Sequence, residues 1–199
     1  MKRRTLILVI VLIVVVFLSA TLGTCVFIKY KANKTKEKFL HMASEIVKQN
    51  TQDKENIEED KKLSKEELEI NDKVIGILKI PKIDLKAPIR EGTESDILKY
   101  AIGHFVESNF FYGNVALAAH NRGIYSQYFE KINELVKGDE ITYITKFGEK
   151  VYRVIQIKSI ASTDWSVIEN IGKEEITLIT CVKNRDDLRL CVKGEKINK

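Results

Sequence analysis

The sequence predicts a mainly β fold, a closed or nearly closed barrel that follows one membrane-spanning helix. Residues 5–28 are almost wholly apolar and contain no charged side chain. After residue 73 the chain divides into seven or eight short strand-like runs and only two or three short helical ones. Because so many short strands would leave exposed edges in an open sheet, closure into a barrel is the favoured arrangement.

The first element is the apolar run at residues 5–28. As a helix it would extend about 36 Å, which is enough to cross the hydrocarbon core of a bilayer with some tilt. It is too long for the apolar part of a cleaved signal peptide, and no persuasive cleavage site accompanies it. We therefore expect a cytoplasmic N-terminus at residues 1–4 and an uncleaved transmembrane signal anchor at residues 5–28.

The orientation of this anchor is ambiguous from charge alone. Three basic residues precede the apolar run, and five lysines follow it within ten positions. Counting them favours a cytoplasmic C-terminal domain. However, a basic start followed by an apolar run is typical of a secretory signal, whose first basic cluster stays inside the cell.

Residues 29–72 are polar, rich in lysine and glutamate, and predicted to form a partly helical stalk that lifts the folded domain off the membrane. A capping box at Ser64 and Glu67 predicts a short helix to about Ile70. The basic start of the segment could lie on anionic lipid headgroups, although a solubilising spacer is the simpler interpretation. A weak helical stripe comprises Phe39, Met42, Ile46 and Val47.

Residues 73–199 are expected to form the barrel domain. Alternating or continuous apolar runs predict strands at 74–80, 83–89, 115–119, 140–146, 150–160, 175–180 and 188–193. A capping pattern at Thr93 and Asp96 predicts a short helix through Tyr100. A second helix is expected at 126–136, with one apolar face that comprises Tyr128, Phe129, Ile132 and Leu135.

The composition excludes several classes of function. The formal net charge is +5, but lysines alternate with acids and no basic block is interleaved with aromatic residues, so nucleic acid is not expected as a partner. The three cysteines and three histidines lack the spacing of zinc ligands and are too few for a disulfide framework. Scattered acids form no calcium-binding loop. We therefore expect neither a metal site nor a cofactor.

A thiol at a strand end is the first candidate for chemistry. Cys181 ends a β-branched, apolar run, and the charged, turn-rich segment 183–187 follows at once. His120 likewise ends an apolar strand, so two strand ends on one barrel rim would let this base face the thiol. His104 is a second candidate base.

An acyl-transfer intermediate also requires donors for its oxyanion. Arg189 starts the strand after Cys181, and a short hairpin would return it beside the thiol. Arg185 lies in the intervening loop and Arg122 is adjacent to the histidine, so both are weaker candidates.

Together these residues resemble the pattern of sortases, the transpeptidases of Gram-positive cell surfaces. The run from Thr177 to Cys181 followed by Arg189 is similar to the TLxTC-to-arginine signature of that family. The similarity covers residues of about 74–196 and includes three further motifs: Ile102-Gly103-His104, Gly113-Asn114 and Ala118-Ala119-His120-Asn121.

The resemblance implies an eight-stranded β-barrel held outside the cell by a single-pass membrane anchor. It also implies that Cys181 is the nucleophile, His120 the acid/base, and Arg189 the partner of the oxyanion or substrate backbone. Cleavage would fall between threonine and glycine of a motif similar to Leu-Pro-x-Thr-Gly in a surface protein. The acyl group would pass through a thioester to an amine, either a cell-wall precursor or a pilin lysine.

Two positions depart from the family pattern: Ala119 replaces the usual glycine, and Phe110-Phe111-Tyr112 replaces a proline-glycine approach. The short interval between the histidine and cysteine argues against class B, and the absence of a second apolar span or lid motif argues against a pilin-polymerising class C enzyme. A compact class A-like or class D-like enzyme is expected. The alternatives are a pilin-polymerising sortase, a membrane-tethered thiol peptidase without transfer, and a catalytically silent binding barrel.

Cys191 shares a strand face with Arg189 and Lys193, which raises a position near the active rim as an alternative, but simple packing is the favoured interpretation. A disulfide between Cys181 and Cys191 would block catalysis.

Overall fold

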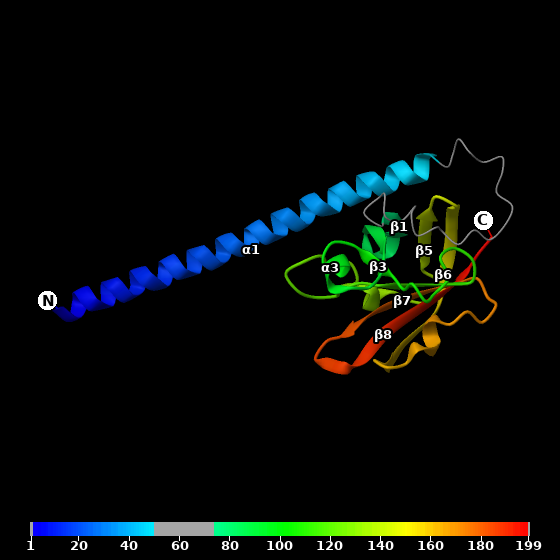
Figure 1. Ribbon diagram of the computed structural model, residues 1–199. Coiled ribbons are helices and arrows are strands. Elements are labelled where there is room, and N and C mark those ends of the chain that lie inside the picture. The colour runs from blue at the N-terminus through cyan, green and yellow to red at the C-terminus, as the bar shows by residue number, and fades with distance from the viewer. Residues whose placement is uncertain (1, 50–73, 199) are drawn as a thin grey trace.

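The structure, a computed structural model, describes residues 2–49 and 74–198 (Figure 1). The capping box expected at Ser64 and Glu67 lies outside the described residues. Eight strands are present: β1 (Val74–Ile80), β2 (Leu85–Glu91), β3 (Ile102–His104), β4 (Asn114–Ala118), β5 (Glu140–Thr145), β6 (Gly148–Ala161), β7 (Glu175–Val182) and β8 (Arg185–Lys196). The helical elements within the described residues are α1 (Lys2–Gln49), α3 (Ser95–Leu98) and three 3-10 turns, η1 (Pro81–Ile83), η2 (Ile132–Glu134) and η3 (Trp165–Ile168).

The strands form a closed barrel in the order β1-β2-β3-β4-β7-β8-β6-β5. The β2–β3 and β4–β7 pairs are parallel, and the other neighbours are antiparallel. Closure leaves no strand of the sheet without a neighbour on both sides. The predicted mainly β fold with an eight-stranded barrel is confirmed.

The barrel interior is the main hydrophobic core. Its filling includes Leu117, Tyr143, Tyr152, Leu178 and Val192, all essentially inaccessible to solvent. Each such side chain contributes about 1.5–3 kcal/mol relative to an exposed one. A second cluster lies outside the wall of β4, β7 and β8 and is covered by η3, which contributes Val167 and Ile168.

The helix expected at 126–136 does not form. Turns and the 3-10 turn η2 occupy this segment instead. The four residues of the expected apolar face are nevertheless buried: Tyr128, Phe129, Ile132 and Leu135. Hydrogen bonds to distant groups replace those of a helix, since the Phe129 N–H donates to the His120 carbonyl and the Tyr128 hydroxyl donates to the Tyr100 carbonyl.

Two smaller expectations also differ from the structure. The helix predicted from Thr93 to Tyr100 is the single turn α3, whose N-cap is Glu94 and which has no side-chain cap. The three-residue strand β3 was absent from the predicted strands because it is too short for a periodic pattern to reveal.

Helix α1 runs without interruption through residue 28, the expected end of the anchor. It includes a segment long and apolar enough to cross a membrane. Beyond that segment, Phe39 and Ala43 pack against Val74 and Ile77 of β1 and Ile144 of β5. The first part of the expected stalk is therefore docked on the barrel by its apolar stripe, not separated from it as a spacer (Figure 1). The division of the chain at residues 28 and 72 stays a prediction.

Candidate active site

The pairing registers put Cys181 and Arg189 on adjacent strands, and His120 lies two residues beyond the end of the neighbouring strand β4. In the parallel β4–β7 pair Ala118, the last residue of β4, lies opposite Ile179, and His120 and Cys181 each follow two residues later along the chain. In the antiparallel β7–β8 pair Cys181 lies directly opposite Arg189. The residues just before His120 and Cys181, Ala119 and Thr180, are 61 positions apart and are joined by a hydrogen bond, so His120 and Cys181 follow at the same end of the barrel wall.

Strand alternation shows which face they share. Along β4 and β7, Leu117 and Leu178 point into the interior core, whereas Ala116 and Ile179 belong to the outer cluster. Side chains two positions apart project from the same face of a strand. Continuation of this alternation along β7 places Cys181 on the outer face, and Arg189 shares that face through Cys191 of the same cluster. His120 lies beyond the end of β4, and the same alternation predicts the outer face for its side chain. All three are partly exposed.

The β7–β8 hairpin is tighter than expected. Strand β7 continues to Val182 and β8 begins at Arg185, so the turn consists of Lys183 and Asn184 instead of the whole segment 183–187. Asn184 has φ 60°, a left-handed conformation that asparagine tolerates. A register shift follows Cys181, and bulges of this kind re-aim side chains beside active sites.

Arg189 is held by its own hairpin. Its Nη1 donates to the carbonyl oxygens of Asp186, at 2.9 Å, and Leu188, at 2.8 Å. A guanidinium has five N–H donors, and no hydrogen bond within the described residues uses the other three. The two rival cations have acidic partners, because Arg185 pairs with Asp187 at 2.8 Å and Arg122 approaches Asp186 at 3.7 Å.

His120 lies in a partly desolvated position. Burial lowers its pKa from the ordinary 6.5, so the imidazole is mostly neutral at pH 7 and can accept a proton. Its carbonyl oxygen accepts a hydrogen bond from the Phe129 N–H at 3.0 Å, which fixes the backbone after β4. The site therefore combines a neutral base, a thiol and a cation with spare donors.

Asn121 is a site residue to which the sequence had assigned no role. Its Nδ2 donates to the Cys181 carbonyl oxygen and so links the loop after His120 to the strand that carries the thiol. Its place beside His120 in the motif Ala118-Ala119-His120-Asn121 was the signal that could have found it. Thr180 adds a second link, since its hydroxyl donates to the Ala119 carbonyl at 2.7 Å.

A third connection lies deeper in the outer wall. Thr177 Oγ1 donates to Asn114 Oδ1 at 2.8 Å, and Asn114 Nδ2 donates to the Val167 and Glu169 carbonyls at 2.9 and 3.0 Å. These bonds attach η3 to β4 and β7. The threonines and the asparagine of the sequence motifs thus hold the strands that carry the site.

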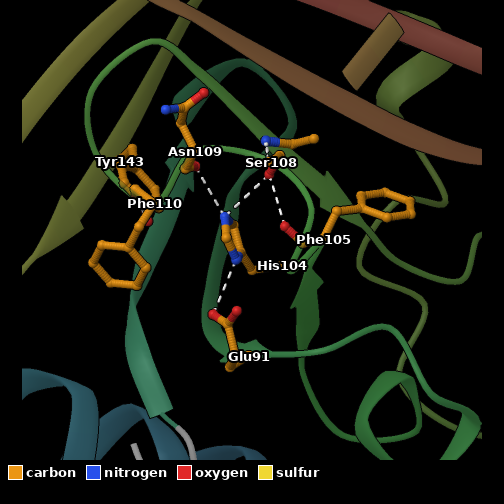
Figure 2. A network of polar contacts seen from close by, with 8 residues as sticks. Glu91, His104, Phe105, Ser108, Asn109, Phe110 and Tyr143 are labelled. Carbon is orange, nitrogen blue, oxygen red and sulfur yellow. Dashed lines mark hydrogen bonds and ion pairs between the residues drawn. The ribbon is translucent and has the colours of Figure 1, made fainter. Parts of the chain in front are cut away.

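His104, the second candidate base, belongs to a separate buried network (Figure 2). Its side chain is enclosed, with Nδ1 2.9 Å from Glu91 Oε2 and Nε2 3.0 Å from the Asn109 carbonyl oxygen. Ser108 Oγ lies 3.2 Å from the same Nε2. Both ring nitrogens have partners away from Cys181, which indicates a structural role.

The unusual segment Phe110-Phe111-Tyr112 is anchored by polar contacts. The Tyr143 hydroxyl donates to the Phe110 carbonyl at 2.7 Å, and the Lys150 ammonium donates to the Phe111 carbonyl. That ammonium also lies 4.2 and 4.3 Å from the centroids of the Phe111 and Tyr112 rings, within the range of cation–π attraction. The next residue, Gly113, has φ 76°, which favours glycine and lets its N–H reach Glu174 at 2.9 Å.

Cys191 is not at the active rim. It is 1% exposed, lies opposite Ile179 in the β7–β8 pair and packs in the outer cluster beneath η3. Burial raises the pKa of its thiol to about 11. Both Cys181 and Cys191 are free thiols in the structure, so packing, the favoured interpretation, describes Cys191.

Comparison with protein families identifies the barrel. A family model described as the sortase domain matches residues 78–197, which is more than half of the chain. The chain belongs to the sortase family. Across the described residues, no group of three histidine, cysteine or acidic side chains is arranged to hold a metal ion.

Individual sortases show the extent of the similarity. The chain is 36% identical to sortase D of Bacillus subtilis over 109 residues, which cover 53% of each chain. It is also 36% identical to sortase A of Bacillus anthracis over 126 residues, which cover 62% of this chain and 60% of the other. The chain thus spans little more than half the length of these relatives.

Solved sortase structures superpose on the barrel. A sortase transpeptidase of Clostridium perfringens matches with a TM-score of 0.65 at 26% identity, over 83% of this chain and 99% of the other. Sortase A of Listeria monocytogenes matches with a TM-score of 0.59 at 30% identity, over 63% of this chain and 88% of the other.

Proposed function

We propose that this sortase is a cysteine transpeptidase that cleaves a sorting motif similar to Leu-Pro-x-Thr-Gly and transfers the acyl group to an amine. The observation that supports the proposal is that Cys181 lies directly opposite Arg189 in the β7–β8 pair, with His120 just beyond the end of the neighbouring strand β4. Acyl transfer requires a thiol nucleophile, a base within reach and donors for an oxyanion, and these three side chains supply them.

The reaction begins when His120 accepts the proton of the Cys181 thiol. The thiolate sulfur attacks the threonine carbonyl carbon of the sorting motif, and its oxygen becomes an oxyanion stabilised by the spare N–H donors of Arg189. The His120 imidazolium then donates its proton to the leaving glycine amine as the peptide C–N bond breaks. A thioester and a free amino-terminal glycine result.

The thioester is resolved by an incoming amine. This amine attacks the thioester carbonyl, gives a proton to His120 and expels the Cys181 sulfur, which regains a proton as the new amide forms. A cell-wall precursor amine is the proposed acceptor, with a pilin lysine as the alternative. The sortase A and sortase D relatives support a compact class A-like or class D-like enzyme.

We place the barrel outside the cell, tethered by the apolar segment of α1 as a single-pass anchor. This placement is supported by the apolar helix and by the chemistry, because surface proteins and wall precursors meet outside the membrane. The apolar helix is also compatible with a signal sequence, so a topology assay with a reporter fused after Lys199 provides an independent test.

Transpeptidation of a sorting-motif peptide library in the presence of an amine acceptor tests the proposed reaction. We expect an amide product, a trapped thioester at Cys181, and loss of both in Cys181→Ala. Only carboxylic acid product, whatever the acceptor, would instead identify a thiol peptidase. No turnover by a folded wild-type protein, with surface display unchanged in the Cys181→Ala strain, would identify a silent binding barrel. Preference for a pilin lysine over a wall-precursor amine would support pilin polymerisation.

A further inference from the structure

A cavity of about 360 Å³ lies between helix α1 and the barrel. At about 30 Å³ for each water molecule, it holds roughly a dozen waters, and it falls in the size range of small-ligand sites. One wall is the α1 face that carries Lys29, Asn33 and Lys36, which recur at helical spacing. The opposite wall includes Tyr125 and Lys131 from the segment between β4 and β5.

The cavity has the charge and donors to hold an anion. Three lysines line it, Lys29, Lys36 and Lys131, against two carboxylates, Asp84 and Glu130, so its lining is net positive. The remaining polar lining comprises the amides of Asn33 and Gln127 and the hydroxyls of Ser126 and Tyr125, together with the Tyr128 hydroxyl, whose own O–H already donates to the Tyr100 carbonyl. This combination of ammonium groups with neutral donors suits a phosphate oxygen.

The position of the cavity along α1, just beyond the membrane-spanning segment, indicates that the phosphate belongs to a lipid headgroup. At a rise of 1.5 Å per residue, Lys29 and Asn33 lie about 1.5 and 7.5 Å beyond residue 28, where the uncharged run ends. The headgroup layer of one leaflet is roughly 5–8 Å thick, so these residues fall within it and Lys36 lies just above.

The loop that lines the cavity also fits a membrane interface. Ile124 and Tyr125 are 47% and 37% exposed, although both are apolar or aromatic. Such residues are enriched where a protein meets the headgroup region. The loop is not remote from the proposed chemistry, because it directly follows His120 and Asn121, and Asn121 binds the Cys181 carbonyl.

We propose that the cavity between α1 and the loop after His120 binds the phosphate-bearing headgroup of an anionic phospholipid. The lysines hold the phosphate, and the headgroup bridges the anchor helix to the loop. This site rests on the membrane placement proposed above but not on the transpeptidase reaction. Insertion of the protein into nanodiscs tests the membrane placement, and this result is independent of whether a headgroup binds in the cavity.

The experiment uses the full-length protein in phosphatidylcholine nanodiscs with or without phosphatidylglycerol. Native mass spectrometry after release counts the retained lipids, and hydrogen exchange of residues 121–131 locates their effect. We expect selective retention of phosphatidylglycerol and slower exchange of this segment. Each of Lys29→Gln, Lys36→Gln and Lys131→Gln is expected to weaken retention about fivefold, as for one basic residue near an anionic surface.

Three controls make the result decisive. Lys173→Gln alters an exposed lysine outside the cavity and is expected to leave retention unchanged. Glu130→Gln removes a negative charge from the lining and is expected to strengthen retention, which a damaged fold would not do. Inorganic phosphate added to pure phosphatidylcholine nanodiscs is expected to have no effect on exchange.

Equal retention of the two lipids, or retention unaffected by the lysine variants, would overturn the proposal. If inorganic phosphate slowed the hydrogen exchange of residues 121–131 as much as phosphatidylglycerol does, the assignment of the ligand to a lipid would be overturned. Failure of the protein to enter nanodiscs would overturn the membrane placement itself, and the headgroup site with it.

Discussion

The hydroxyl of Thr180 is expected to hold the base and the nucleophile in register. Thr180 is buried and directly precedes Cys181 in β7. Its hydroxyl donates at 2.7 Å to the carbonyl of Ala119, which directly precedes His120. Thr180→Val keeps the side-chain shape but leaves that carbonyl without this donor. The expected cost is about 1–3 kcal/mol of the free energy of unfolding.

The effect on activity is expected to exceed the effect on stability. A displacement of about 1 Å between reacting groups can reduce a rate about a hundredfold, so loosening of the β4 and β7 ends should lower kcat/KM roughly ten- to a hundredfold. Thr177→Val is the matched control. It removes a buried hydroxyl from the same strand, with acceptors at Asn114 and Val167, but four residues from Cys181. Its expected stability cost is similar or larger, with kcat/KM within about twofold of wild type per folded molecule.

Urea unfolding followed by circular dichroism gives the two stability changes, and hydrolysis or transfer of a fluorogenic sorting-motif peptide gives kcat/KM. Activities are compared under conditions where both variants are fully folded. If the two variants lose equal activity, or if Thr180→Val loses none, the hydroxyl does not control the alignment of His120 and Cys181.

Two further predictions concern titratable groups. Burial alone would raise the pKa of Glu174, but hydrogen bonds from the Lys150 ammonium and the Gly113 N–H hold it below the ordinary 4.5. A carboxyl with a lowered folded-state pKa stabilises the fold above its unfolded-state pKa, and this contribution is lost as pH falls through the folded-state value. Glu174→Gln should therefore flatten the stability profile as pH falls below the ordinary pKa of 4.5, and an unchanged slope in urea titrations would contradict this interaction. In a Cys25→Ser background, iodoacetamide at pH 8 should add one label to the folded protein, at Cys181, because Cys191 is buried and its pKa is raised to about 11. Intact mass shows the count, and a second adduct before unfolding would mean that η3 does not protect Cys191.

The barrel was predictable because its signals are local. Seven strands carry apolar patterns of their own, and short strands in such number favour closure. Strand β3 is too short to show a period, and it is ordered by pairing with β2 and β4. The segment after His120 has a helical apolar pattern but is held by bonds to Tyr100 and His120, so tertiary contacts override the local pattern.

The candidate site, like the barrel, was only partly predictable from the sequence. Sequence patterns predict Cys181, His120 and Arg189 near strand ends, but the pairing of Cys181 with Arg189, and the position of the β4 end beside β7, depend on the strand registers. Asn121 could not be assigned because its partner is a backbone carbonyl 60 positions away. For Cys191 simple packing was the favoured interpretation, and its burial in the outer cluster with residues of η3 confirms it.

The docking of α1 bears on how a soluble form of this protein should be designed. A fragment that starts at residue 73, the sequence-predicted domain boundary, would lack Phe39 and Ala43. These two side chains cover Val74, Ile77 and Ile144 in the full chain. The uncovered apolar patch would be available for self-association, so oligomers of such a fragment would reflect the truncation. A fragment that begins after residue 28 would remove the uncharged apolar run while retaining the helical turns that cover this patch.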